Sequence, residues 1–277
     1  MKHGPRGGKG SLFLPLCSAA SVVILLFILV PIVQLMTSPD PDVLVKTIGD
    51  PDVLRAIGLS MRTAGLATLI AFAFGTPLAY LLAHRDFPGK HLVESLVDLP
   101  LVIPHPVIGI AILAVAGRAS PVGRFLQALG VQVMGTVTGI VAVLLFVGLP
   151  LYVNSAKNGF EAVPRRLEYV ARNLGAGPFG AFRRVTFPLA WRSVLVGMVL
   201  CFARAVSEFG AVVVVAGNSV KTNTLPLHIN ALYQGYADAS APFAVATLLA
   251  VMAILTLVLK TLIEWKIGNG ETAGSRG

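Results

Sequence analysis

The segment EAVPRRLEYVARNLGAGPFGAFRRVTFP, residues 161–188, is a polar, arginine-rich stretch in a chain that is otherwise mostly apolar. Helical spacing gives it an apolar stripe on one face. That stripe consists of Leu167, Val170, Ala171 and Leu174, and the opposite face carries Arg165, Arg166, Glu168 and Arg172. Glycine and proline interrupt the pattern at 175–178, so we expect a short amphipathic helix, a break and a second basic turn. Such a helix either docks on a partner protein or lies on a lipid surface.

Composition identifies an all-α integral membrane protein. The chain has 277 residues, of which 55% are hydrophobic and 13% charged. A soluble domain carries about 25% charged residues. The apolar runs are long and unbroken, which indicates helices that span a bilayer. Because Cys17 and Cys201 lie far apart within apolar segments, we expect them to pack and not to ligate a metal or form a bridge.

The apolar runs predict six transmembrane helices, beginning with a retained anchor at 12–36. The other five are expected at about 60–83, 92–116, 134–154, 193–217 and 240–262. The third of them contains Pro100, Pro104 and Pro106, which interrupt the backbone hydrogen bonds of a helix. Such breaks are tolerated at membrane depth where the freed groups face protein or a water-filled cavity.

Basic residues are distributed unevenly between the two sides of this topology. Fifteen Lys and Arg lie in the N-terminal tail, the 84–91 loop, the 157–192 segment and the C-terminal part of the chain, against five in the opposite loops. The positive-inside rule therefore predicts an inner-membrane protein with cytoplasmic tails at 1–11 and 264–277 and a cytoplasmic 157–190 loop. The net charge of +9 is explained by topology, so we expect membrane lipid and no nucleic acid as a partner.

Within the opening segment, ARNLG at 171–175 is followed by nine residues and then by Val185-Thr-Phe-Pro188. This resembles the cytoplasmic loop signature of ABC-importer permeases: Glu-Ala-Ala, three residues, Gly, nine residues, Ile, one residue, Leu-Pro. Aligned on Gly175, Tyr169 stands where the family has its glutamate, and Glu168 lies one residue early. The resemblance implies that ATPase coupling involves Leu167, Glu168, Tyr169, Val170, Ala171, Leu174, Gly175 and Pro188.

Further stretches resemble the oxyanion branch of these permeases, which serves molybdate, tungstate and sulfate. They include SEFGAVVVV at 207–215 and AGNSVKTNTLPL at 216–227. The resemblance implies a type I permease fold at 55–263 that functions as a dimer. It also implies two cytoplasmic ATPase subunits, which bind ATP-Mg and carry out the catalysis, and an external binding protein. No catalytic residue, cofactor or metal is then expected on this chain.

The preferred substrate under this resemblance is molybdate or tungstate, with sulfate or thiosulfate as the alternative. A protein of another class, an ion-coupled secondary transporter, often has coupling carboxylates and broken helices at mid-membrane. In this sequence the deep carboxylate, Glu208, lies beside an arginine, and no internal repeat is evident. A membrane enzyme is less favoured still, because no constellation of nucleophile and base stands out in the sequence.

Several polar residues near the spans are candidates for the translocation pathway. Arg204 and Glu208 are four apart, so they are expected to pair, either to lock the helix in the bundle or to contact the substrate. His105 and the preceding Pro104 are either packed or exposed to the pathway. A polar external segment either meets the binding protein, offers donors to the anion, or is a solvated loop. Its candidate residues are Asn218, Thr222, Asn223 and Thr224.

Overall fold

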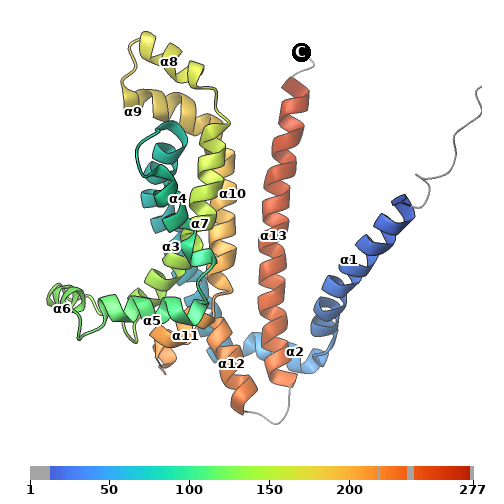
Figure 1. The fold of residues 1–277 in the computed structure, drawn as a ribbon. Coiled ribbons are helices and arrows are strands. Elements are labelled where there is room, and N and C mark those ends of the chain that lie inside the picture. The colour runs from blue at the N-terminus through green and yellow to red at the C-terminus, as the bar shows by residue number, and fades with distance from the viewer. Residues whose placement is uncertain (1–12, 218, 236–239, 275–277) are drawn as a thin grey trace, which may run out of the picture.

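The computed structural model describes residues 13–217, 219–235 and 240–274, and every regular element within these ranges is helical. The longer helices are α1 (Phe13–Thr37), α3 (Pro51–His84), α7 (Val137–Glu161), α10 (Phe187–Val206) and α13 (Ser240–Gly274). The shorter elements are α2 (Pro41–Gly49), α4 (Lys90–Asp98), η1 (Leu99–Leu101), α5 (His105–Ala116), α6 (Pro121–Ala128), α8 (Arg165–Asn173), α9 (Pro178–Ala181), η2 (Phe182–Thr186), α11 (Gly210–Ala216), η3 (Val220–Thr222) and α12 (Leu225–Gly235). Figure 1 shows α3, α4, α7 and α10 bundled together, with α8 and α9 at one end of the bundle.

Five helical stretches among the described residues are long and apolar enough to cross a membrane. They are α1, α3, α7, α13 and the continuous stretch Pro178–Val206 that includes α10. The pair formed by Lys90–Leu101 and His105–Ala116 passes the same test together but is bent by 114°. The all-helical, multi-pass membrane character is thus confirmed, with five spans, or six if the bent pair is one of them. The helix expected at 92–116, with its proline interruptions, is present as two helical segments with a bend between them.

The proline run produces that bend. Pro100 lies in η1, Pro104 is the N-cap of α5, and Pro106 lies in the first turn of α5. A proline in the first turn of a helix costs no hydrogen bond, because the amides there have no intrahelical partner. The prolines therefore end one helix and begin the next, and the two run in very different directions.

The single helix expected at 193–217 is wrong. Helix α10 ends at Val206, and α11 begins at Gly210 after a three-residue break. The short helices α2, α6 and α12 were not expected at all. Each has a proline within its first two residues, Pro41, Pro121 and Pro226, and this start signal could have revealed them.

Helix α7 packs against both α3 and α10, and small residues allow the backbones to approach closely. A Cβ atom on Gly148 of α7 would lie 2.6 Å from Sγ of Cys201 in α10. A Cβ on Gly75 of α3 would lie 2.8 Å from the ring of the buried Tyr152 in α7. These close approaches make α3, α7 and α10 a tightly packed unit.

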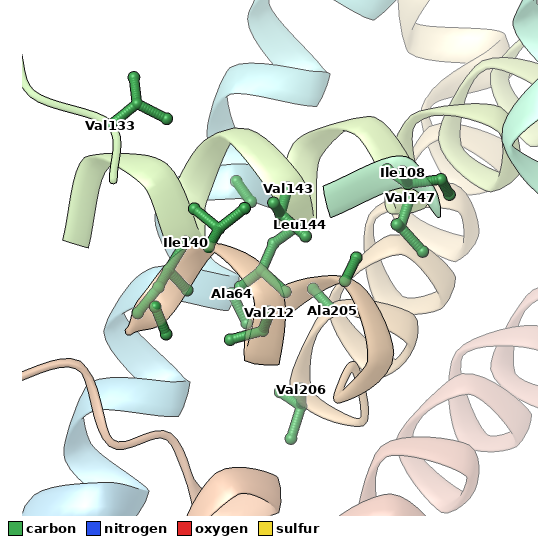
Figure 2. Packing of buried hydrophobic residues seen from close by; sticks show 14 residues of the cluster. Ala64, Ile108, Val133, Ile140, Val143, Leu144, Val147, Ala205, Val206 and Val212 are labelled. Carbon is green, nitrogen blue, oxygen red and sulfur yellow. The ribbon is translucent and has the colours of Figure 1, made fainter. Parts of the chain in front are cut away.

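The two broken helices are joined to this unit by one hydrophobic cluster. Figure 2 shows Val143, Leu144 and Val147 of α7 near Val212 of α11 and Ala205 of α10. The same cluster includes Ile108 of α5. Both helix breaks are therefore held against the centre of the bundle.

The N-terminal helix lies at the edge of the fold. None of the residues of α1 is buried, and Figure 1 shows α1 diverging from the bundle beyond α13. The hydroxyl of Thr247 in α13 donates to the carbonyl of Leu35 near the end of α1 at 3.0 Å. Helix α1 therefore exposes an apolar surface along its whole length.

Candidate coupling loop and translocation pathway

The cytoplasmic-loop signature forms a compact turn between α7 and α10. Helix α8 follows Pro164 and is closed by Gly175, whose φ of +94° a residue with a side chain adopts only with strain. The amide of Gly175 donates to the carbonyl of Arg172 at 2.9 Å, and the amide of Ala176 donates to that of Ala171 at 3.0 Å. This pair of bonds is a Schellman motif. Helix α9 and the π-helical turn η2 then lead into α10, in which Pro188 occupies the first turn.

The apolar stripe of α8 is largely exposed. Leu167, Val170 and Leu174 are exposed, and Leu174 has 84% of its surface accessible. Tyr169 is exposed as well, whereas Ala171 is partly buried. A surface that combines aliphatic and aromatic groups with a basic flank suits a protein partner, because these apolar side chains remain uncovered within the chain itself.

Glu168 is directed toward the chain's own bundle and not outward with the arginines. Its side chain is 12% exposed. The carboxylate accepts a hydrogen bond from the hydroxyl of Tyr80 at 3.1 Å and another from the hydroxyl of Thr186. Nε2 of His84 lies 3.9 Å from the same carboxylate. One side chain of α8 is therefore bonded to both α3 and η2.

The partners of Glu168 were not identified from the sequence. Tyr80 and His84 are four residues apart at the end of α3, and their rings stack with centroids 4.4 Å apart. Arg165, the first residue of α8, donates to the carbonyl of Ala83 at 3.3 Å. An i, i+4 pair of Tyr and His where a span ends is the signal that would have pointed to them.

A second polar cluster lies where the two broken helices meet. His105 begins α5, Arg204 lies in the last turn of α10, and Glu208 lies in the break before α11. A Cβ atom on Gly210 would lie 3.0 Å from Cβ of His105, so the starts of α5 and α11 are in direct contact. Three side chains from two distant parts of the sequence are thus brought together.

Glu208 is the centre of this cluster and is 2% exposed. Nη2 of Arg204 donates to Oε2 of Glu208 at 2.7 Å, and the amide of Ala211 donates to Oε1 at 2.8 Å. The predicted pair is therefore present, and the carboxylate also binds an amide at the start of α11. Nη2 of Arg204 also lies 2.7 Å from Nε2 of His105, which accepts the bond because a guanidinium has no acceptor. Pro104 is exposed beside it.

The polar segment between α11 and α12 is more ordered than a solvated loop. Thr222 is buried, and its hydroxyl donates to the carbonyl of Ala216 at 2.7 Å. Thr224 is buried too, so neither threonine offers its hydroxyl at the surface. Asn223 lies 3.1 Å from Nδ1 of His228 and helps to line a cavity of about 300 Å³ between α11 and α12. Asn218, the fourth residue predicted for the outer mouth, lies outside the described residues.

This arrangement defines a class of protein: a multi-pass helical membrane protein with a structured loop at one end and broken helices in its core. Residues 75–267 match the family of binding-protein-dependent transport system inner membrane components. The chain belongs to this family and is therefore a permease subunit of an ABC importer, as the sequence resemblance predicted.

Individual relatives agree with that assignment. The molybdate/tungstate transport system permease protein WtpB of Thermococcus kodakarensis is 38% identical over 257 residues, which cover 92% of this chain and 96% of that protein. WtpB of Pyrococcus furiosus is 38% identical over 84% of this chain and 86% of its own. The sulfate transport system permease protein CysW of Escherichia coli K12 is 37% identical over 82% of this chain and 78% of that protein.

Solved structures share the fold. A chain of a bacterial ABC transporter for the import of the polysaccharide alginate has a TM-score of 0.73 at 18% identity, covering 92% of this chain and 96% of that one. A chain of a bacterial alginate ABC transporter in complex with an alginate pentasaccharide-bound periplasmic protein also gives 0.73, at 17% identity, with 92% of this chain and 94% of that one covered. At such identities the likeness establishes the architecture alone, and it confirms the type I importer fold.

Proposed function

We propose that this permease moves molybdate or tungstate across the cytoplasmic membrane, driven by ATP hydrolysis in separate ATPase subunits. The assignment of the substrate rests on two molybdate/tungstate permeases that are 38% identical to this chain. The match to one of them covers 92% of this chain. In the functional unit two copies of the chain bind two cytoplasmic ATPases, which hold ATP-Mg. A binding protein delivers the oxyanion from outside, and no residue of this chain catalyses a reaction.

The outward stripe of α8 is the ATPase contact in this proposal. Leu167, Val170 and Leu174 would be covered by an apolar groove of the ATPase, and Tyr169, Arg165 and Arg166 would lie at its rim. Gly175 ends α8, and Pro188 lies in the first turn of α10. Glu168 does not reach the ATPase. It attaches α8 to α3, so that movement of the ATPase is passed to the transmembrane bundle and is not absorbed by the loop.

The same proposal places α8 and both termini in the cytoplasm. The support is the asymmetry of Lys and Arg along the sequence, since positive charge accumulates in cytoplasmic loops. The opposite end, with α11 and α12, then faces the binding protein. Asn223, Asn230 and Gln234 line the 300 Å³ cavity there and offer neutral amide donors to an oxyanion.

Between these ends, the cluster of His105, Arg204 and Glu208 is a point where the anion can interact with the bundle. Arg204 is 25% exposed and His105 is 40% exposed, so both are accessible while Glu208 is buried. Ionisable residues within spans often mark the substrate pathway. The buried pairing with Glu208 orients Arg204 and balances its charge.

The test is uptake by proteoliposomes that contain the permease with its ATPase, supplied with the cognate binding protein. ATP-dependent uptake of labelled molybdate and tungstate is expected, with little competition from a hundredfold excess of sulfate. Calorimetry of the binding protein should show tight binding of the two metal oxyanions. Uptake of sulfate without uptake of molybdate or tungstate would show that the substrate is sulfate. The 37% identity to a sulfate permease supports this alternative. Uptake without ATP would favour an ion-coupled transporter.

A further inference from the structure

A groove of about 560 Å³ lies between α3 and the segment that joins α9 to α10. Its lining is largely apolar and aromatic. One wall is a single face of α3, with Phe72, Ala73, Thr76, Pro77 and Tyr80. The facing wall is formed by Pro178, Phe179, Phe182 and Phe187. The volume lies in the range of small-molecule sites, and nothing in the coupling role of α8 requires such a groove.

Three arginines, Arg85, Arg172 and Arg183, complete the lining. They come from the loop after α3, from α8 and from η2, so separate parts of the chain converge on the groove. All three are exposed, and none forms an ion pair within residues 13–217, 219–235 and 240–274. Their positive charge is therefore available to an external anion.

The groove runs along α3 from the interior of the membrane span to its end. Phe72 and Arg85 are thirteen positions apart, which along α3 corresponds to about 20 Å at 1.5 Å per residue. Phe72 and Ala73 lie well inside the span Pro51–His84, whereas Arg85 follows its last residue. The apolar part thus lies at hydrocarbon depth, and the basic part lies at the interface with water.

We propose that this groove binds an anionic phospholipid of the cytoplasmic leaflet. One acyl chain lies along α3 between the aromatic rings, and the phosphate group binds Arg85, Arg172 and Arg183. Basic pockets between transmembrane helices on the cytoplasmic side have the chemistry that anionic headgroups require. The assignment to that leaflet rests on the orientation in the proposed function.

Two other occupants fit the groove less well. A second copy of the permease placed on it by twofold symmetry would bring the same three arginines toward each other, and like charges in an interface are unfavourable. A soluble ATPase cannot reach Phe72, which lies about 20 Å from the end of the span. A phospholipid fits both parts of the groove, because its acyl chain matches the apolar part and its phosphate matches the three arginines.

The test uses the full-length permease with its ATPase in maltoside detergent, titrated with dioleoylphosphatidylglycerol or dioleoylphosphatidylcholine, and bound lipid is counted by native mass spectrometry. Phosphatidylglycerol is expected to bind more tightly. Replacing both Arg85 and Arg183 by Gln should weaken its binding by roughly 25-fold, at about fivefold per basic residue near an anionic surface. Arg184→Gln, beside Arg183 but outside the groove, is the matched control and should leave binding unchanged.

A second variant tests the apolar part. Ala73→Trp should fill the groove and prevent binding of both lipids, whereas Leu69→Trp, one turn away on an exposed site of α3, should not. Equal affinity for the two lipids, or unchanged binding in both the arginine and the Ala73 variants, would overturn the proposal. A disulfide between two copies of an Ala73→Cys variant would overturn it too, because a second copy would then cover the groove. Molybdate uptake by the unmodified permease is measured in a separate experiment. If that permease binds phosphatidylglycerol as expected but does not take up molybdate, only the proposed substrate is contradicted.

Discussion

The hydroxyl of Tyr80 donates to Oε1 of Glu168 at 3.1 Å and so connects α3 to α8 across 88 positions of sequence. The signature of ABC permeases has its glutamate at the position of Tyr169, and this chain has the carboxylate one residue earlier. A shift by one position rotates a side chain by about 100° around a helix. The carboxylate therefore points to the bundle, while Tyr169 occupies the exposed surface.

Replacing Glu168 by Ala should uncouple ATP hydrolysis from transport. Hydrogen bonds to a charged group contribute about 1.5–3 kcal/mol each, so the attachment of α8 to α3 would weaken markedly. Uptake per ATP hydrolysed is expected to fall by about tenfold or more, because the loss of even one such bond exceeds the roughly 1.4 kcal/mol that corresponds to a factor of ten. Transport and phosphate release are measured on the same proteoliposomes. Tyr80→Phe, which removes one of the donors, should have a smaller effect, and an unchanged ratio in both variants would exclude this role for Glu168.

Replacing Leu174 by Glu should prevent the ATPase from binding without unfolding the permease. The side chain is 84% exposed, so the change adds no buried charge to the isolated chain. Loss of an apolar anchor at the centre of an interface costs about 2 kcal/mol or more. Co-purification of the two subunits is the readout, with the thermal unfolding midpoint of the permease as the check on folding. Asn173→Glu introduces the same charge at the neighbouring exposed position and should retain the complex.

Removing Arg204 should destabilise the fold more than neutralising Glu208. Arg204→Met leaves a carboxylate that is 2% exposed without its guanidinium, and breaking a buried pair in this way costs about 3–5 kcal/mol. Glu208→Gln keeps the Oε1 acceptor for the amide of Ala211, and Arg204 still reaches water. Unfolding midpoints of the single variants and the double variant form the measurement. The double variant should recover much of the loss, and additive effects would show that the two side chains do not interact.

Enlarging Gly148 should separate α7 from α10. A Cβ there would lie 2.6 Å from Sγ of Cys201 and 3.3 Å from its carbonyl oxygen, and the backbone cannot yield without moving α10. Gly148→Val is expected to cost about 1–3 kcal/mol or more by overpacking. Gly65→Val in α3 is the control, because no heavy atom lies within 4 Å of a Cβ at that site. Thermal unfolding of both variants in detergent decides the matter, and equal midpoints would contradict the packing described for α7.

The sequence was sufficient for the features that depend on local pattern. Helix α8, its apolar stripe and its end at Gly175 follow from helical spacing and from the need for a positive φ. The pairing of Arg204 with Glu208 follows from a spacing of four residues, and it survives even though Glu208 lies beyond the end of α10. Apolar run length located α1, α3, α7 and α13, because the bilayer sets a minimum length for a helix.

Features that depend on tertiary contacts were not accessible in this way. Nothing in the order of residues shows that His105 would meet Arg204, 99 positions away, since that contact requires two helix breaks to coincide. The direction of Glu168 depends on Tyr80 and Thr186, which lie outside its own helix. The run at 207–217 resembled a continued span because hydropathy does not register a buried carboxylate. That carboxylate accepts a hydrogen bond from the amide of Ala211 at the start of α11.

The pairing of Arg204 with Glu208 also has a kinetic consequence for the proposed pathway. A lone guanidinium inside the bundle would hold a divalent oxyanion strongly, and a conducting path requires that the ion leave as readily as it enters. Because Glu208 already balances the guanidinium, an anion at this level would exchange one hydrogen-bond partner for another and gain little energy. Its residence time there would be short, so the rate of each transport cycle would be set by the opening and closing of the bundle and not by escape from a trap.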